Sequence, residues 1–205
     1  MGYEFGKREL NKAKTRLNIL DVVYKLGSTT NFEELMVTTI AGKVGITEKT
    51  FYNYFPKKED ILKYMTSIWW LDLFVKQHEE PLKGELAIRR IFEHTAKNVN
   101  EHPKLMASYV ASLLTRDLEA SSYNIEAVDR YVLYPDLPFL YEMYIPSGNE
   151  ILIQHIMEID PSQDPTNKLL HLATSFYGSF LVAHTSGMDI NKLYNDSLNM
   201  IFNIK

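Results

Sequence analysis

The chain has 205 residues, of which 45% are hydrophobic and 23% are charged, a composition typical of one or two folded domains and not of a disordered chain. It contains no cysteine, which excludes disulfides, cysteine-ligated zinc and thiol nucleophiles. No apolar run approaches the ~20 residues of a membrane-spanning helix, and the N-terminus lacks the apolar segment of a secretory signal. These features predict a cytoplasmic protein without a membrane partner.

Charge is distributed unevenly along the chain. The net charge is −4, but residues 1–64 contain eleven Lys or Arg against eight acidic residues, whereas residues 65–205 contain eleven against eighteen. The first segment is therefore basic and the second acidic. A difference of this size also arises by chance, so it points only weakly to a polyanionic partner for the N-terminal segment.

Apolar residues recur every three or four positions along most of the chain, which predicts amphipathic helices. The expected helices span about 9–26, 37–44, 48–54, 58–80, 85–101, 104–118, 148–159, 166–186 and 189–204. The segment 119–146 is rich in tyrosine and interrupted by three prolines, and it shows no clear pattern. No strand, internal repeat or low-complexity tract is evident, so the predicted fold class is all-α.

The two short helices at 37–44 and 48–54 have the features of a helix-turn-helix. Ala41 is small enough for a second helix to cross over it, and Gly45 permits the positive φ of a tight turn. Thr47 stands where an N-cap is needed, because its hydroxyl can accept an amide hydrogen bond from the second helix. Phe51 and Phe55, four residues apart, can share the inward face of that helix. Each feature alone also occurs in ordinary helical bundles.

With its flanking helices, the run IAGKVGITEKTFYNYFPKKEDIL resembles the DNA-binding domain of TetR-family transcriptional repressors. The likeness covers about residues 9–64, and its most specific part is the pattern Gly–x–Thr–x–x–Thr–Phe–Tyr–x–Tyr–Phe–Pro–x–Lys that begins at Gly45. The resemblance implies a three-helix DNA-binding domain at 1–64 and a helical regulatory and dimerisation domain of about nine helices at 65–205. It also implies an Ω-shaped homodimer that reads double-stranded DNA at a palindromic operator.

The resemblance assigns DNA contacts residue by residue. Phosphate contacts fall on Thr47, Thr50, Tyr52 and Lys58, and base-edge contacts on Lys49, Asn53 and Tyr54. Tyr54 could instead pack against the preceding helix. The family often has Ser or Thr at the start of the helix near residue 36, but Leu35 and Met36 occupy that region here. A phosphate contact from this corner therefore shifts to Thr38.

The segment 65–205 shows no catalytic or metal-binding motif. The chain's six histidines lack HxxxH or HExxH spacing, Gly178–Ser179 lacks the flanks of a nucleophile elbow, and there is no Gly-rich phosphate loop. We therefore expect no enzymatic activity and no cofactor. Under the resemblance, this segment binds an inducing small molecule and forms the dimer. The predicted pocket residues are Trp69, His94, Tyr109, Leu113 and Phe176, and the predicted dimer residues are Phe176, Phe180, Leu193, Leu198 and Ile201.

The sequence thus predicts a transcriptional regulator, a repressor that a small molecule releases from its operator. Two alternatives stay open. A TetR-like protein without ligand sensing would bind DNA constitutively. A helical carrier or enzyme for an apolar metabolite would carry the helix-turn-helix likeness by accident. Salt-sensitive binding to a palindrome would exclude the second alternative, and release of that DNA by a small molecule would exclude the first.

Overall fold

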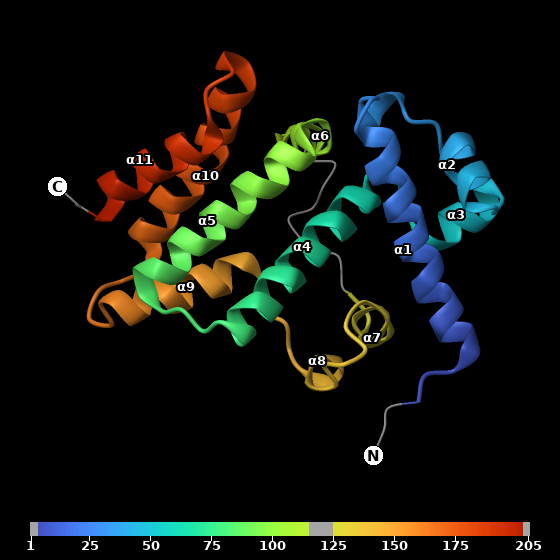
Figure 1. The fold of residues 1–205 in the computed structure, drawn as a ribbon, viewed down its shortest axis with the longest axis horizontal. Helices are drawn as coiled ribbons and strands as arrows, with labels where there is room; N and C mark the ends of the chain where they lie inside the picture. Colours follow the sequence, from blue (N-terminus) through green and yellow to red (C-terminus); the bar gives the residue numbers. More distant parts are fainter. Residues whose placement is uncertain (1–3, 115–124, 203–205) are drawn as a thin grey trace. The chain divides into compact units, whose positions relative to one another are not determined.

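The computed structural model describes residues 4–114 and 125–202. Within these ranges the secondary structure consists of α-helices and one 3₁₀ turn, η1, without strands (Figure 1). This confirms the predicted fold class. The elements are α1 (Lys7–Gly27), η1 (Phe32–Glu34), α2 (Val37–Val44), α3 (Glu48–Tyr54), α4 (Asp60–Glu79), α5 (Gly84–Glu101), α6 (Pro103–Leu114), α7 (Ala127–Leu133), α8 (Phe139–Glu142), α9 (Gly148–Ile159), α10 (Thr166–Ser186) and α11 (Ile190–Phe202). None of the described helices combines the length and apolarity that crossing a membrane requires.

The helices expected from periodicity are present with nearly the expected ends. The helix predicted at 104–118 is described as far as Leu114, and the rest of that prediction lies outside the described residues. The described part of 119–146, where no pattern was evident, contains the two short helices α7 and α8. Pro135 and Pro138 fall between these helices, which is consistent with proline's exclusion from helix interiors.

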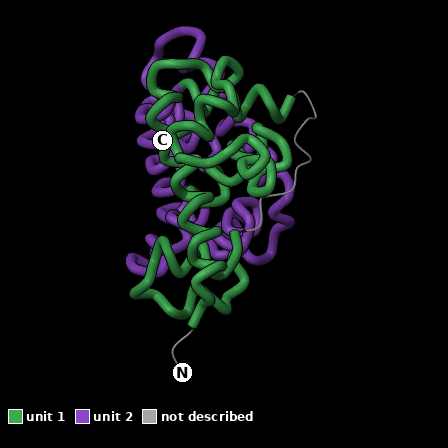
Figure 2. Tube along the Cα trace, turned by 90° about the vertical axis from the view of Figure 1, so that its right-hand side faces the viewer, with its two compact units in different colours: residues 1–69, 104–145 green, residues 70–103, 146–205 purple. Residues whose placement is uncertain are grey.

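The chain divides into two compact units, which Figure 2 colours separately. Unit 1 comprises residues 1–69 and 104–145, and unit 2 comprises residues 70–103 and 146–205. The boundary falls inside α4, so this helix contributes its first half to unit 1 and its second half to unit 2. The functional division into 1–64 and 65–205 is a separate prediction.

The core of unit 1 is built around α1. This helix packs against α2 and α7. Its inward residues Ile19 and Val23 are fully buried, together with Phe51 from α3 and Tyr64 from α4. A β-carbon at Gly27 would come within 2.6 Å of the Leu105 side chain. Glycine at the end of α1 therefore leaves room for Leu105 of α6.

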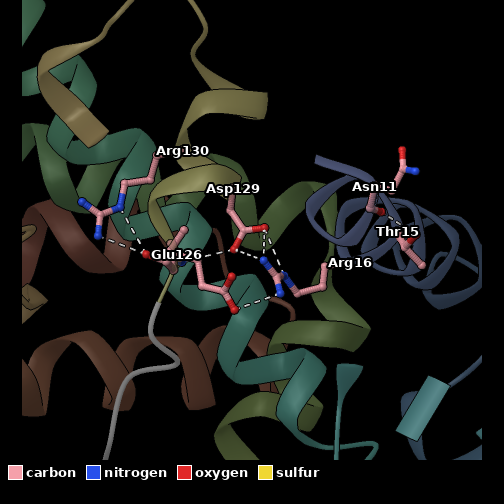
Figure 3. Close-up of polar contacts among 7 residues, drawn as sticks. Asn11, Thr15, Arg16, Glu126, Asp129 and Arg130 are labelled. Atoms are coloured by element: carbon pink, nitrogen blue, oxygen red, sulfur yellow. Dashed lines mark hydrogen bonds and ion pairs between the residues drawn. The ribbon is translucent and has the colours of Figure 1, made fainter. Parts of the chain in front are cut away.

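A buried ion pair joins α1 to α7 within unit 1 (Figure 3). Arg16 donates from Nη2 to both carboxylate oxygens of Asp129 at 2.8 and 2.9 Å, and from Nε at 3.0 Å. Its Nη1 donates to Glu126 at 3.0 Å, and Asp129 also accepts the backbone N–H of Glu126. Burial raises the pKa of Asp129, and the contacts with Arg16 oppose that rise. The pair therefore fixes α7 on α1 through a largely satisfied set of hydrogen bonds.

Unit 2 is a helical bundle in which α10 and α11 pack against each other, with α11 against α5 and α10 against α9. Three aromatic rings occupy its centre. Phe92 on α5 lies edge-on to Phe176 and Tyr194, at centroid distances of 5.6 and 4.9 Å. Phe176 and Tyr194 stack at 5.9 Å. This cluster joins three helices of the unit through contacts favourable for aromatic rings.

Candidate nucleic-acid interface and ligand pocket

The turn between α2 and α3 has the geometry that a helix-turn-helix requires. Gly45 adopts φ 80° and ψ 32°, a left-handed conformation that favours glycine, and the N–H of Ile46 bonds to the carbonyl of Ala41 at 3.0 Å. The Thr47 hydroxyl accepts the N–H of Thr50 at 3.1 Å and so caps α3. Ala41 is buried beneath the turn. The roles predicted for these residues in the turn are confirmed.

Helix α3 has one buried face and one exposed face. Phe51 and Phe55 are fully buried, as their spacing predicted. On the other side, Lys49 and Asn53 are exposed, and Tyr52 retains 45% of its accessible surface. These three side chains are therefore available for contacts with DNA. Their types suit phosphate oxygens and base edges.

The remaining predicted DNA contacts lie around the same helix pair. Thr38, in the first turn of α2, is exposed, and so is the α3 cap Thr47. Thr50 is half-buried, and its hydroxyl lies 2.9 Å from that of Thr47. Tyr54 is half-buried and packs against the core of unit 1. The segment 37–58 carries four lysines against one glutamate, which makes this surface basic.

Lys58 makes hydrogen bonds within the fold that the sequence did not predict. Its ammonium group donates to the backbone carbonyls of Phe32, Glu33 and Leu35 at 3.0, 3.0 and 3.2 Å. It also lies 4.9 Å from the centroid of the Phe32 ring. All three donor hydrogens of Lys58 can thus be used to hold η1 beside the start of α4. A phosphate contact from this side chain would need at least one of these bonds to be exchanged.

Residues 19–65 match the family model described as "Bacterial regulatory proteins, tetR family". Residues 19–65 are thus similar to the DNA-binding domain of the tetR family. This agrees with the resemblance seen in the sequence, and the TetR-type turn and recognition helix are those described above. No curated protein matches the chain.

Two solved structures share the fold of almost the whole chain. One is Thermus thermophilus FadR, a TetR-family transcriptional repressor in complex with lauroyl-CoA, with a TM-score of 0.64, 18% identity, and coverage of 91% of this chain and 93% of that one. The other is a TetR transcriptional regulator from Rhodococcus sp. RHA1, with a TM-score of 0.57, 14% identity, and coverage of 93% and 96%. The TetR-type fold therefore extends beyond the N-terminal domain.

Unit 2 contains a pocket of about 530 Å³, within the range of small-molecule sites. Its wall is formed by the end of α4, the connection to α5, and parts of α5 and α9. Of the residues predicted to line a pocket, His94 lies on this wall, whereas Phe176 belongs to the aromatic cluster of the same unit. Trp69, Tyr109 and Leu113 belong to unit 1, where Trp69 is buried and Tyr109 packs against the core.

His155 is a pocket residue that periodicity did not single out. It lies on α9 beside the buried Ile151 and Ile156, is only 2% exposed, and forms part of the pocket wall. Its Nδ1 lies 2.8 Å from Oε2 of Glu158, and the same oxygen accepts the N–H of Gly84 at 2.8 Å. Burial opposes ionisation of Glu158, but the pKa of its carboxyl group is lowered by the hydrogen bonds from His155 and Gly84, together with the charge interaction with His155 and a hydrogen bond from Gln154. The histidine ring is thus held in one orientation.

The predicted dimer residues are divided between core and surface. Phe180 and Leu198 are buried within unit 2, Phe176 is in its aromatic cluster, and Leu193 and Ile201 are partly exposed. Other apolar side chains of α10 face outward. The exposed ones are Leu170, Tyr177, Leu181 and Val182, of which Leu170, Tyr177 and Leu181 follow helical spacing along one face. We call these four residues the α10 stripe. Beside it, Gly178 leaves open space where a side chain would stand.

Proposed function

We propose that this protein is a TetR-family transcriptional regulator, a homodimeric repressor whose affinity for a palindromic operator is controlled by a small molecule. The observation that carries the proposal is the α2–α3 geometry. A glycine turn and a threonine cap hold α3 so that its aromatic side chains are buried while Lys49, Tyr52 and Asn53 stay exposed. This is the arrangement in which a recognition helix enters the major groove.

The exposed residues divide by the kind of contact that they can make. Lys49 and Asn53 can donate to acceptors on base edges, and such contacts distinguish one sequence from another. The Tyr52 hydroxyl and the exposed threonines suit phosphate oxygens, which hold the protein on any sequence. We therefore assign specificity to Lys49 and Asn53, and register on the backbone to Tyr52, Thr38 and Thr47.

Dimerisation is supported by the α10 stripe. Leu181 retains 58% of its accessible surface and Leu170 59%, and both lie on the face of α10 that carries Tyr177. Contiguous exposed apolar side chains of this kind mark protein interaction sites. A second copy packed here would bury them, and the dimer would place two recognition helices on one palindrome. A monomer would contact only one half-site and would therefore discriminate less well between DNA sequences.

Control by a small molecule is supported by the pocket of unit 2 and by α4. The pocket wall includes the second half of α4, and the first half of this helix belongs to the unit that contains α3. A ligand that binds one orientation of α4 more tightly would shift the population of operator-binding dimers. One protein of this fold, Thermus thermophilus FadR, was solved with lauroyl-CoA, so that compound serves as an anionic comparison in the effector screen.

The test is operator selection from random DNA followed by fluorescence anisotropy at several salt concentrations. We expect a palindromic consensus and a steep loss of affinity with salt. Lys49→Ala should flatten the ranking of operator variants, whereas Lys192→Ala, which removes an exposed lysine of α11, should leave ranking and affinity unchanged. Absence of any sequence preference would refute the proposal, because a carrier or enzyme would show none.

A further inference from the structure

We propose that the pocket of unit 2 takes an uncharged apolar molecule that carries a hydroxyl or N–H group, with Nε2 of His155 as the acceptor that recognises it. This inference rests on the proposed function, because it names the ligand class of the control site. Its evidence is the hydrogen-bonded arrangement of His155, Glu158 and Gly84, and the balance of charge and apolar surface on the wall.

The arrangement determines which ring nitrogen of His155 carries the proton. Oε2 of Glu158 accepts both the Gly84 N–H and the contact from Nδ1, and the lowered pKa of Glu158 keeps the carboxylate ionised. An ionised carboxylate can only accept, so Nδ1 is the donor. In the neutral imidazole, Nε2 is then an acceptor. Among the described residues Nε2 makes no hydrogen bond, although the side chain is 2% exposed and lines the pocket.

Gly84 makes this arrangement possible. It opens α5 with φ +55°, a conformation that L side chains rarely adopt, and it lies close to the end of α9. A β-carbon at this position would approach Cγ1 of Ile159 at 3.1 Å. A side chain here would be strained by the left-handed φ and crowded by Ile159, so glycine favours the close approach in which this N–H donates to Glu158. The carboxylate is oriented from both α5 and α9.

The rest of the wall favours an uncharged ligand with an apolar body. Charged residues balance, with three cationic and three anionic side chains. They are Lys76, Lys83 and Arg90 against Glu79, Glu80 and Glu158. Lys76 is paired with Asp72 at 2.6 Å, and Arg90 lies 3.6 Å from Glu93. The apolar residues of the wall outnumber its charged residues. They are Leu73, Phe74, Pro81, Leu82, Ile91, Pro146 and Ile151.

A metal is a weaker occupant for the same pocket. Three histidines, His78, His94 and His155, lie on its wall. Within 4–114 and 125–202, however, no three His, Cys, Asp or Glu side chains are grouped closely enough to hold a metal ion. Burial and the nearby Lys76 also lower the pKa of His94, so a neutral imidazole is favoured there, which again suits an uncharged ligand.

The experiment compares three probes on the full-length dimer by isothermal titration calorimetry: 4-hexylphenol, its methyl ether 4-hexylanisole, and 4-hexylbenzoate. The phenol and the ether have the same apolar body, but the ether cannot donate. We expect the phenol to bind about tenfold or more tightly than the ether, because the ether cannot donate to Nε2 and so forms no hydrogen bond with this acceptor. We expect the benzoate to bind more weakly than the phenol, because its charge must be desolvated against a balanced wall.

Nitrogen chemical shifts of the histidine rings supply an independent readout. In the free protein, the His155 resonances should show a protonated Nδ1 and an unprotonated Nε2, and 4-hexylphenol should shift Nε2 more than Nδ1. His155→Phe, which keeps a ring but removes the acceptor, should bring the phenol-to-ether ratio close to one. His78→Phe, at an exposed position on the same wall, should keep the ratio of the wild type.

The outcomes separate this inference from the proposed function. Equal binding of phenol and ether, tighter binding of the benzoate, or no binding of any probe would overturn the ligand class, even if lauroyl-CoA releases the operator. Selective binding of the phenol without any effect on operator affinity would support the ligand class and refute control through this pocket. If His155→Phe does not fold, the wild-type ratio and the nitrogen shifts still decide.

Discussion

Removal of Arg16 should destabilise the protein strongly, because the structure leaves its partner no access to water. Asp129 is fully buried, and three of its hydrogen bonds come from Arg16. An Arg16→Met substitution keeps an apolar stem of similar length but leaves the carboxyl group without a cation. Breaking a buried pair from one side costs about 3–5 kcal/mol. We expect the free energy of unfolding, measured by urea denaturation at pH 7.5, to fall by this amount.

The pH dependence gives the loss a second signature. Burial raises the pKa of Asp129, and in Arg16→Met the opposing contacts are gone, so the folded-state pKa rises further. A carboxyl whose pKa is higher in the folded than in the unfolded state stabilises the fold below the unfolded-state pKa and loses that contribution as pH rises through the folded-state value. The deficit of Arg16→Met should therefore be smaller at pH 4.5 than at pH 7.5.

Two controls make the reasoning refutable. Lys25→Met removes an exposed ion pair within α1, where Lys25 and Asp21 have side chains that are 73% and 58% exposed, and it should change stability by less than about 1 kcal/mol. The double variant Arg16→Met, Asp129→Leu should recover much of the loss, because the only carboxylate left without Arg16 is the 53% exposed Glu126. An Arg16→Met protein within 1 kcal/mol of the wild type at pH 7.5 would show that α7 does not depend on this pair.

Three further outcomes are expected. Gly45→Ala should cost about 1–2 kcal/mol in thermal denaturation, because the left-handed φ is strained for alanine although a β-carbon there meets no atom within 4 Å; an unchanged melting temperature would contradict this. Lys58→Ala should lower stability by about 1–3 kcal/mol, because the hydrogen bonds to three carbonyls are lost, and it should leave the salt dependence of operator binding unchanged. If the slope of log affinity against log salt concentration became smaller by about one, the ammonium group would contact a phosphate in the complex. Leu181→Glu should convert a dimer of about twice 23.8 kDa into a folded monomer in light scattering, while Phe180→Glu, which places a charge in the core, should unfold the chain; a dimeric Leu181→Glu protein would exclude the α10 stripe as the interface.

The helices and the turn were predictable because the information that determines them is local. Periodic apolar residues define α1, α5 and α10, and the glycine and threonine that shape the α2–α3 turn stand within two residues of each other. The buried and exposed faces of α3 followed from the same spacing. Each of these features depends on residues that are neighbours in sequence, so a pattern of a few positions contains it.

Helices α7 and α8 were not predictable for the opposite reason. They are seven and four residues long, too short to be stable alone. Distant or irregular contacts hold them. Arg16 reaches Asp129 across 113 residues of sequence, and Arg130 donates to the carbonyls of Leu140 and Met143. The Tyr141 hydroxyl donates to the carbonyl of Pro135 at 2.7 Å. None of these contacts leaves a periodic trace in the sequence.

The same distinction separates the two parts of the candidate site. Exposure of Lys49 and Asn53 follows from the face of one helix. An amphipathic pattern, however, does not distinguish an apolar residue that packs in its own core from one that packs against a partner. Phe180 and Leu198 were assigned to the dimer for this reason, and both are buried within unit 2. His155 adds a third case. Its partner Glu158 is only three residues away, yet the tautomer depends on Gly84, 71 positions earlier than His155, because that amide and the imidazole share one carboxylate oxygen. A histidine becomes a selective acceptor only when the fold supplies both neighbours, so recognition of the ligand is a property of the packing of α5 against α9 and not of any single helix.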